Sequence, residues 1–320
     1  MRVFVAGASG FVGQAVLGPL LSAGHEVRAG MRHPSGPGAV RFDLDDDATL
    51  APALAGVDAA LYLVHGLDRD GFSAWEEQAA RAFAEACRAA GVRRVVYVGG
   101  VVPTHRTWSG RVPSIASRHL AARLATGREL RRAAPHVLEL RAGVIVGAGG
   151  ASFRMIRDVA ARAPVIVRAP WLASEQQPIA LSDVAAAVVR SLDLDVDGAL
   201  DLPGPTTLTS EAFLRLVAAQ LGNHVHFIDR SLDASIIVAG IVRLTRADPR
   251  VVLAILEGAD GADYVAANDG LYAVCPELPR TPLRDAVRAA LIDEERTLRT
   301  RDVVVEALVH RVAGRRSGRR

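Results

Sequence analysis

The 320-residue sequence contains no lysine, so all 38 of its strongly basic side chains are arginine. Lysine is the residue that forms Schiff bases and that serves as an amine general base. Arginine cannot replace it, because its pKa of about 13 makes it a poor mediator of proton transfer. Any chemistry in this chain therefore depends on other groups.

Cysteine and long apolar runs are also scarce. The two cysteines, Cys87 and Cys275, provide no disulfide framework, and no metal-ligand spacing surrounds either of them. No apolar run approaches the roughly 20 residues that a membrane-spanning helix needs. The chain enters an apolar strand directly at Val3, which leaves no room for a signal peptide. We therefore expect a soluble, cytoplasmic protein with no metal site.

The charge is nearly balanced, with a formal value of +3 and a sequence pI of about 9.3. Much of the positive excess lies in residues 311–320, which contain five arginines between Arg311 and Arg320. Such a tail is either a solvated end or a contact for nucleic acid or an anionic membrane surface. No recognition helix and no interleaving of aromatic with basic residues accompanies it, so we expect no binding to nucleic acid.

The most informative feature that is present stands at the N-terminus. The apolar run Val3–Ala6 breaks into Gly7-Ala8-Ser9-Gly10-Phe11-Val12-Gly13, after which the apolar residues take helical spacing. Glycine permits a tight turn, a close approach of a pyrophosphate to the backbone and a close packing of helix on strand. The helix N-terminus then offers unpaired N–H groups to the phosphates. The pattern predicts a dinucleotide site made by Gly7, Ser9, Gly10, Phe11, Val12 and Gly13.

Short β-rich runs alternate with helical periodicity beyond this motif, which is typical of a doubly wound parallel sheet. The runs predicted as strands are Glu26–Met31, Val40–Phe42, Ala59–Val64, Arg94–Val98 and Val137–Leu140, with Val144–Val146 as the exit from the last. A long helix is predicted over Gly71–Ala90. We therefore expect an α/β fold with a Rossmann-type doubly wound parallel sheet, whose NAD(P)-binding core spans residues 1–150.

The pattern changes near Gly150 to short elements interrupted by prolines. The elements expected there are helices over Phe153–Ala161, from Ser182 as N-cap and from Thr209, and strands over Pro164–Val167, Ala199–Leu202 and Val225–Ile228. We expect Ala199–Leu202 to return to the main sheet. Residues 151–297 are thus predicted to form a smaller C-terminal, substrate-side lobe interleaved with the core, and residues 298–320 a C-terminal helix and basic tail.

The residues after the second predicted strand indicate which nucleotide is bound. An acidic residue there would favour NAD by accepting a hydrogen bond from the ribose 2′-hydroxyl. This chain has Arg32 and His33 instead, and an arginine fork pairs well with a 2′-phosphate. We therefore predict that NADP(H) is preferred over NAD(H). The alternative is that Arg32 is a solvated turn residue before Pro34.

Several further stretches support a family resemblance. They are Leu61–Gly66, Gly91–Gly100, Ser117-Arg118-His119, Leu140–Gly147, Ser152–Arg157 and Gln177–Val184. Together with the spacing Gly-x-x-Gly-Phe-x-Gly, they resemble the extended and atypical short-chain dehydrogenases/reductases, in particular the NAD(P)H-binding, NmrA-like group related to the accessory Rossmann subunit of respiratory complex I. The resemblance covers about the first 220 residues. It implies NADP(H) binding, with either reduction of small molecules or a sensing or structural role for the nucleotide.

The resemblance also implies cofactor contacts beyond the glycine turn. These are Val64, His65, Gly99, Gly100 and Arg118, with Asp43 placed to hold the adenine amino group or to cap a loop. Association into a homodimer through the 71–90 helix and the 114–132 segment is a further expectation.

The catalytic residues usual in this family are missing. Its members carry a tyrosine acid/base four residues before a lysine, and a serine that polarises the substrate carbonyl. Here Ser114 stands at the tyrosine position, Arg118 stands at the lysine position, and Val98-Gly99-Gly100 replaces the serine. The usual proton relay is therefore absent, which also disfavours a sugar-nucleotide epimerase or dehydratase.

Four residues remain as catalytic candidates: His65, Ser114, Arg118 and His119. A histidine can exchange a proton near neutral pH, although each of these histidines could be structural and His119 could simply face solvent. Phe153 and Trp171 could line an apolar substrate pocket, although core packing is the expected role. We therefore predict an NADP(H)-dependent oxidoreductase acting on a hydrophobic small molecule. The alternative is a non-catalytic NADP(H) redox sensor or assembly subunit.

Overall fold

The computed structural model describes residues 1–103, 118–230, 232–246, 248–256 and 262–296. Its centre is a seven-stranded parallel sheet with the order β11-β6-β5-β4-β1-β2-β3. The strands are β1 (Arg2–Ala6), β2 (Glu26–Met31), β3 (Ala39–Arg41), β4 (Ala59–Tyr62), β5 (Arg94–Gly100), β6 (His136–Ala142) and β11 (Gly198–Leu202). The strand order reverses between β1 and β4, so the predicted Rossmann-type doubly wound sheet is confirmed.

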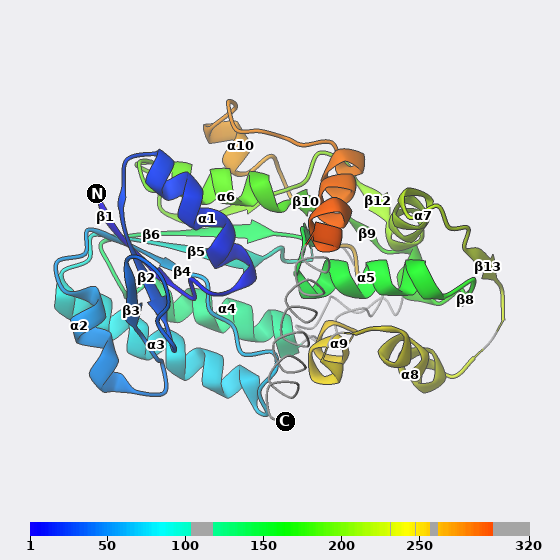
Figure 1. Cartoon of the computed structure of the whole chain (residues 1–320), viewed down its shortest axis with the longest axis horizontal. Coiled ribbons are helices and arrows are strands. Elements are labelled where there is room, and N and C mark those ends of the chain that lie inside the picture. The colour runs from blue at the N-terminus through cyan, green and yellow to red at the C-terminus, as the bar shows by residue number, and fades with distance from the viewer. Residues whose placement is uncertain (104–117, 231, 247, 257–261, 297–320) are drawn as a thin grey trace, which may run out of the picture.

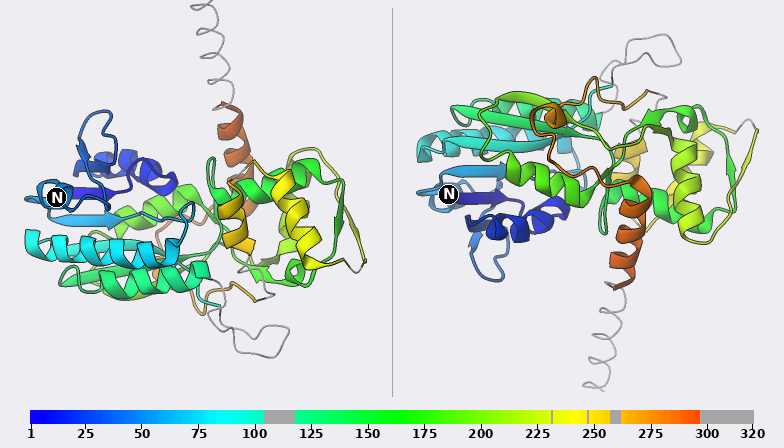
Figure 2. Two further views of the ribbon diagram at one scale, coloured as in Figure 1. Left: turned by 90° about the horizontal axis from the view of Figure 1, so that it is seen from below. Right: turned by 90° about the horizontal axis from the view of Figure 1, so that it is seen from above.

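Helices cover both faces of this sheet (Figures 1 and 2). On one face lie α1 (Phe11–Ser22) and α6 (Leu181–Arg190), and on the other lie α2 (Leu50–Leu54), α3 (Phe72–Ala90) and α4 (Arg118–Leu130). Side chains alternate along a strand, so β1 sends Val3 and Val5 into the first core and Phe4 into the second. The buried strands therefore read as continuous apolar runs, as parallel sheets require.

The second half of the chain builds a lobe beside the carboxyl ends of these strands (Figure 1). Its helices are α5 (Ala151–Arg162), α7 (Ser210–Gln220), α8 (Ala234–Leu244) and α9 (Pro249–Leu256), and residues 283–296 are also helical. Its short strands form the pairs β7 (Ile145–Val146) with β10 (Ile179–Ala180), β8 (Val165–Val167) with β13 (His226–Ile228), and β9 (Glu175–Gln176) with β12 (Leu208–Thr209). Phe153 and Phe213 are fully buried at the centre of the lobe.

After residue 150 the chain crosses several times between the lobe and the sheet. It returns to the sheet through α6 and β11, goes back to the lobe for α7 to α9, and touches the sheet edge again at α10 (Leu271–Val274). Two 3₁₀ turns, Asp47–Thr49 and Pro170–Ala173, complete the assigned elements.

Within the described residues, no helix is long and apolar enough to cross a bilayer, and no group of three or more potential ligands is placed to hold a metal ion.

Several predicted boundaries are wrong. The fifth strand continues past Val98 to Gly100, and the sixth spans His136–Ala142 and not Val137–Leu140. The third strand ends at Arg41, and the fourth ends at Tyr62 and not at Val64, because Leu63 and Val64 turn into a cavity at the sheet edge. The helix expected to start at Ser182 has Ala180 at its N-cap. Asp183 in its first turn instead accepts hydrogen bonds from the backbone and hydroxyl of Thr281. The predicted tail, residues 298–320, lies outside the described residues.

Candidate cofactor and substrate site

The glycine turn after β1 has the geometry of a phosphate cradle. Gly7 has a φ of 83°, a left-handed conformation that favours glycine. A Cβ built on Gly13 would lie 2.1 Å from the Gly7 carbonyl oxygen, so only glycine lets α1 pack this closely on the turn. Gly10 is the N-cap of α1 and leaves the first turn without a side-chain cap. The free N–H groups there, at the positive end of the helix dipole, suit a pyrophosphate.

A cavity of about 190 Å³ opens beside this turn. It is lined by Gly7, Ser9, Gly10, Gly30, Met31, Arg32, Phe42, Asp43, Leu44, Leu63, Val64, His65, Asp68, Arg69 and Trp75. We call it the nucleotide cavity. Seven of the predicted cofactor residues line it, and Phe11, Val12 and Gly13 follow in the first turn of α1. His33 and Gly99 are not among its lining residues, whereas Gly100 lines a neighbouring cavity.

One wall of the nucleotide cavity was missed by the sequence analysis. The Asp45 carboxylate accepts hydrogen bonds from Arg69 Nη2 at 2.7 Å and from Trp75 Nε1 at 2.6 Å. The Arg69 guanidinium lies over the Trp75 ring, 4.0 Å from its centroid. These two hydrogen bonds are the main reason that the pKa of Asp45 is lowered. Asp45 thereby fixes Arg69 and Trp75, which line the cavity together with the predicted adenine contact, Asp43.

Arg32 and Arg69 both line the nucleotide cavity, but they differ in their hydrogen-bond and ion-pair partners. Arg69 is held in a bidentate pair with Asp45, whereas Arg32 is exposed and makes no hydrogen bond or ion pair with any described residue. An unpaired guanidinium at the cavity mouth is available for a phosphate. Asp43 is partly engaged, because its Oδ1 accepts the Asp45 N–H at 3.1 Å. Both readings of Asp43, adenine contact and loop cap, are compatible with this bond.

His65 and His119 approach one another where β4 and β5 end. His65 lines the nucleotide cavity, and His119, in the first turn of α4, lines the next cavity along. Desolvation, with the charge of Arg123 as the second cause, lowers the pKa of His119 to about 3 and that of His65 to about 4. Both shifts favour the neutral imidazole at pH 7, so the predicted role of His65 and His119 in proton exchange stays a prediction.

His119 is the more enclosed of the two histidines. Its side chain is half-buried, and its Nδ1 atom is buried without a hydrogen-bond partner in the described structure. The alternative that His119 faces solvent is therefore wrong. A buried polar atom without a partner is costly, and the His119 residue lines a cavity that a ligand can enter.

Acidification is expected to destabilise the protein partly through His119. The histidine pKa is about 6.5 in an unfolded chain and about 3 here, so between these values only the unfolded state binds the proton. Stability therefore falls as the pH drops below about 6.5, by at most ~1.4 kcal/mol per pH unit for this one group. The variant His119→Phe should show a shallower fall in the free energy of urea unfolding between pH 7 and pH 5. Equal slopes for the two proteins would contradict the burial of His119.

Two other catalytic candidates contribute less to the site. Ser114 lies outside the described residues, and Arg118 is exposed on the first turn of α4. Tyr97 does not replace the missing tyrosine, because it is buried in the second core with its hydroxyl donating to the Arg123 carbonyl at 3.2 Å. Burial raises the pKa of Tyr97 to about 12.

A second cavity, of about 250 Å³, begins at Gly100 and Val101 and extends into the lobe. We call it the head cavity. Its polar lining consists of His119, Arg123, Ser152, Ser174, Glu175, Gln176, Ser210 and Tyr264, and its other walls are mostly apolar. The Ser174 Oγ atom is buried without a partner among the described residues. Trp171 lines this cavity, contrary to its expected role in the core, whereas Phe153 is core as expected.

Comparison with known proteins agrees with this geometry. A family model described as NAD(P)H-binding matches residues 7–141. The 2-alkyl-3-oxoalkanoate reductase of Stenotrophomonas maltophilia (strain K279a) is 33% identical over 118 residues, which are 33% of this chain and 35% of the reductase. The match thus spans about a third of that relative's length.

Solved structures share the fold over nearly the whole chain. The triphenylmethane reductase of Citrobacter sp., complexed with NADP(H), is similar with a TM-score of 0.69 and 18% identity, over 91% of this chain and 100% of that one. The UDP-glucose 4-epimerase of Thermus thermophilus, in complex with NAD, gives a TM-score of 0.67 and 18% identity over 92% and 99%. Residues 7–141 thus match an NAD(P)H-binding family model, and the whole chain has the Rossmann fold of these reductase and epimerase structures.

Proposed function

We propose that this protein is an NADP(H)-preferring oxidoreductase that acts on a hydrophobic small molecule without the Ser-Tyr-Lys triad. The observation that carries the proposal is the mainly apolar head cavity, which adjoins the nucleotide cavity at the carboxyl ends of β4 and β5. Ligands of open α/β sheets bind at this end of the strands. The similarity to a 2-alkyl-3-oxoalkanoate reductase and to a triphenylmethane reductase supports a reductive role.

Each part of the site has a role in this proposal. The nicotinamide cofactor supplies the hydride when it is bound. The first turn of α1 holds the pyrophosphate, and Arg32 pairs with the 2′-phosphate. The neutral imidazole of His119 donates a hydrogen bond from Nδ1 to the substrate carbonyl oxygen and polarises it. Hydride addition breaks the carbonyl π bond, and the alkoxide that forms takes its proton from solvent as the product leaves. The apolar walls around Leu120 and Trp171 exclude water from the reacting atoms.

Deuteride transfer tests the proposal. The protein is saturated with NADPH carrying deuterium at the reactive carbon, and a panel of ketones, enones and quinones is added. Mass spectrometry of the products should find one deuterium in at least one reduced compound, and the label should come from only one face of the nicotinamide. Failure of the saturated protein to oxidise NADPH with any member of the panel would count against the proposal.

Replacement of Arg32 tests the preference for the phosphorylated nucleotide. A lost charge-assisted contact costs about 1.5–3 kcal/mol, so Arg32→Ala should weaken NADPH binding by about 10- to 150-fold and leave NADH binding nearly unchanged. Calorimetric titration of both nucleotides measures this. Arg41→Ala is the matched control, because Arg41 is exposed, paired with Asp46 and not part of the nucleotide cavity. Equal weakening of the two nucleotides would remove Arg32 from this role.

The missing tyrosine and lysine favour a second candidate function, that of a nucleotide-dependent sensor or assembly subunit. A redox sensor needs a large difference in affinity between NADPH and NADP⁺, because that difference is its coupling energy. An enzyme that cycles its cofactor should bind both forms with similar affinity. Titration of the ligand-stripped protein with the two forms in parallel therefore separates the candidates.

A further inference from the structure

A third cavity, of about 210 Å³, continues from the head cavity deeper into the lobe. All of its lining residues are apolar, and we call it the tail cavity. Ile237, Ile241 and Leu244 of α8 form one wall, and Val165 and Val167 of β8 form another. The two cavities share Met155, Ile156, Trp171, Leu214 and Leu256, so they meet across a common wall.

The lining of the tail cavity is unusually open to solvent. Three of its large apolar side chains are strongly exposed: Val165 by 50%, Leu232 by 45% and Ile236 by 57%. Isolated exposed apolar residues are ordinary, but several around one hollow mark a binding site. Burial of this surface by an apolar ligand would be favourable at about 25 cal/mol per Å².

Gly240 indicates that the hollow is kept open. It lies inside α8, where glycine is less favourable than alanine. A Cβ on Gly240 would meet no heavy atom within 4 Å, so packing does not require glycine here. A larger residue at this position would instead project from the wall of the tail cavity, which Gly240 lines.

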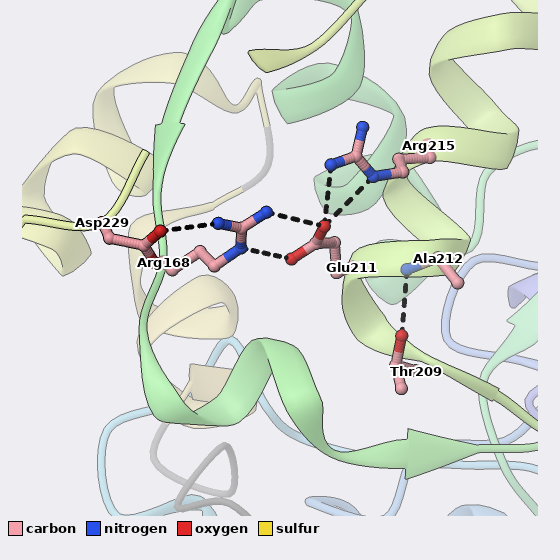
Figure 3. Close-up of polar contacts among 6 residues, drawn as sticks. All are labelled: Arg168, Thr209, Glu211, Ala212, Arg215 and Asp229. Carbon is pink, nitrogen blue, oxygen red and sulfur yellow. Dashed lines mark hydrogen bonds and ion pairs between the residues drawn. The ribbon is translucent and has the colours of Figure 1, made fainter. Parts of the chain in front are cut away.

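A charge network holds the outer wall of the tail cavity in place (Figure 3). Arg168, directly after β8, donates to Glu211 at the start of α7 and to Asp229 after β13. Arg215 donates to the same Glu211 at 2.8 Å, and both arginines lie over the Phe227 ring. The β8–β13 pair is thereby tied to α7, so the wall is a built part of the lobe.

The polarity of the two joined cavities specifies the ligand. The head cavity is lined in part by polar side chains, among them His119 and Ser174, while the tail cavity offers only apolar side chains. The sugar or phosphate groups of a sugar nucleotide would find no polar partner in the tail cavity, at a cost for each group placed there. We infer that the substrate is an amphiphile whose carbonyl-bearing head lies in the head cavity and whose aliphatic chain occupies the tail cavity. The inference rests on the proposed function for the chemistry at the head, but the chain can bind whether or not hydride is transferred.

The affinity for a series of methyl 3-oxoalkanoates with four-, eight- and twelve-carbon acids tests this inference. Binding to the protein loaded with NADP⁺ is measured by calorimetry, and NADPH oxidation is measured separately. The dissociation constant should fall about three- to fourfold per added methylene until the tail cavity is filled. An affinity that is independent of chain length would overturn the inference.

Two variants and one control locate the chain. Ile237→Trp fills the tail cavity and should erase the gain from chain length, while leaving the shortest ester and NADPH unaffected. Gly240→Leu is the second variant, for use if Ile237→Trp does not fold. A Cβ at this position meets no heavy atom within 4 Å, and the variant should weaken the binding of the long esters only. Ala239→Trp is the control, because Ala239 is exposed on the same helix and does not line the tail cavity. If affinity still rises with ester chain length as in the natural protein in both Ile237→Trp and Gly240→Leu, the aliphatic chain binds outside the tail cavity.

The two readouts separate this inference from the proposed function. Chain-dependent binding without reduction of any ester would support the tail cavity and count against the proposed chemistry. Reduction of all esters with equal efficiency would support the chemistry and overturn the tail cavity.

Discussion

Replacing Gly13 by alanine is expected to abolish the binding of NADPH and NADH alike. The added methyl carbon would lie 2.1 Å from the Gly7 carbonyl oxygen and 2.9 Å from the Ala8 Cα atom. Both neighbours are backbone, so α1 must move away from the turn, and the N–H groups that face the pyrophosphate move with it. Calorimetric titration should detect no binding, and thermal unfolding should show a loss of stability.

Gly18→Ala is the matched control for this change. Gly18 lies in the same helix, and a Cβ there would meet nothing within 4 Å. This substitution should leave nucleotide binding intact and raise helix stability by about 1 kcal/mol. If Gly13→Ala bound NADPH as Gly18→Ala does, close packing of α1 on the turn would not be what builds the phosphate site.

Replacing His119 by phenylalanine is expected to lower kcat about 100-fold or more. The loss of one hydrogen-bond donor to a developing oxyanion has about this effect. Affinity for NADPH should stay the same, because His119 lines the head cavity and not the nucleotide cavity. Single-turnover oxidation of bound NADPH by a substrate found in the carbonyl panel measures the change.

His136→Phe controls for the removal of an imidazole. His136 begins β6, at the opposite end of the strands, where its Nδ1 pairs with Asp197 at 3.0 Å. Its kcat should be that of the natural protein. A rise in KM alone, with an unchanged kcat, in His119→Phe would assign His119 a structural role.

The parts of the site that are local in sequence were predictable. Gly7, Gly10 and Gly13 lie in one short segment, and their spacing alone predicts the tight turn between β1 and α1. The alternation of buried strands with helices likewise follows from local patterns of period 2 and period 3.6. The position of Arg32 at the nucleotide cavity follows from the same short unit, because Arg32 comes directly after β2, whereas its contact with a 2′-phosphate stays a prediction.

The parts that depend on long-range packing were not predictable. The Asp45, Arg69 and Trp75 wall joins residues up to 30 positions apart, and no local pattern relates them. His119 was a catalytic candidate from the sequence, but its enclosure was not predictable, because it depends on α4 packing beside the end of β5. Trp171 was assigned to the core because its large ring suits burial, but the shape of the lobe leaves one face of it to a cavity.

The repeated passage of the chain between sheet and lobe constrains how ligands enter. A lobe joined by a single linker can swing open as a hinge, but here α6, β11 and α10 are anchored on the sheet between segments of the lobe. Residues 283–296 return once more, with Leu283 and Val287 buried in the lobe core. A hinge would have to bend all of these crossings together, so we expect the two parts to keep their relative positions during turnover. Ligands would then be exchanged at the solvent-exposed side of the tail cavity, around Val165, Leu232 and Ile236, without a movement of the lobe.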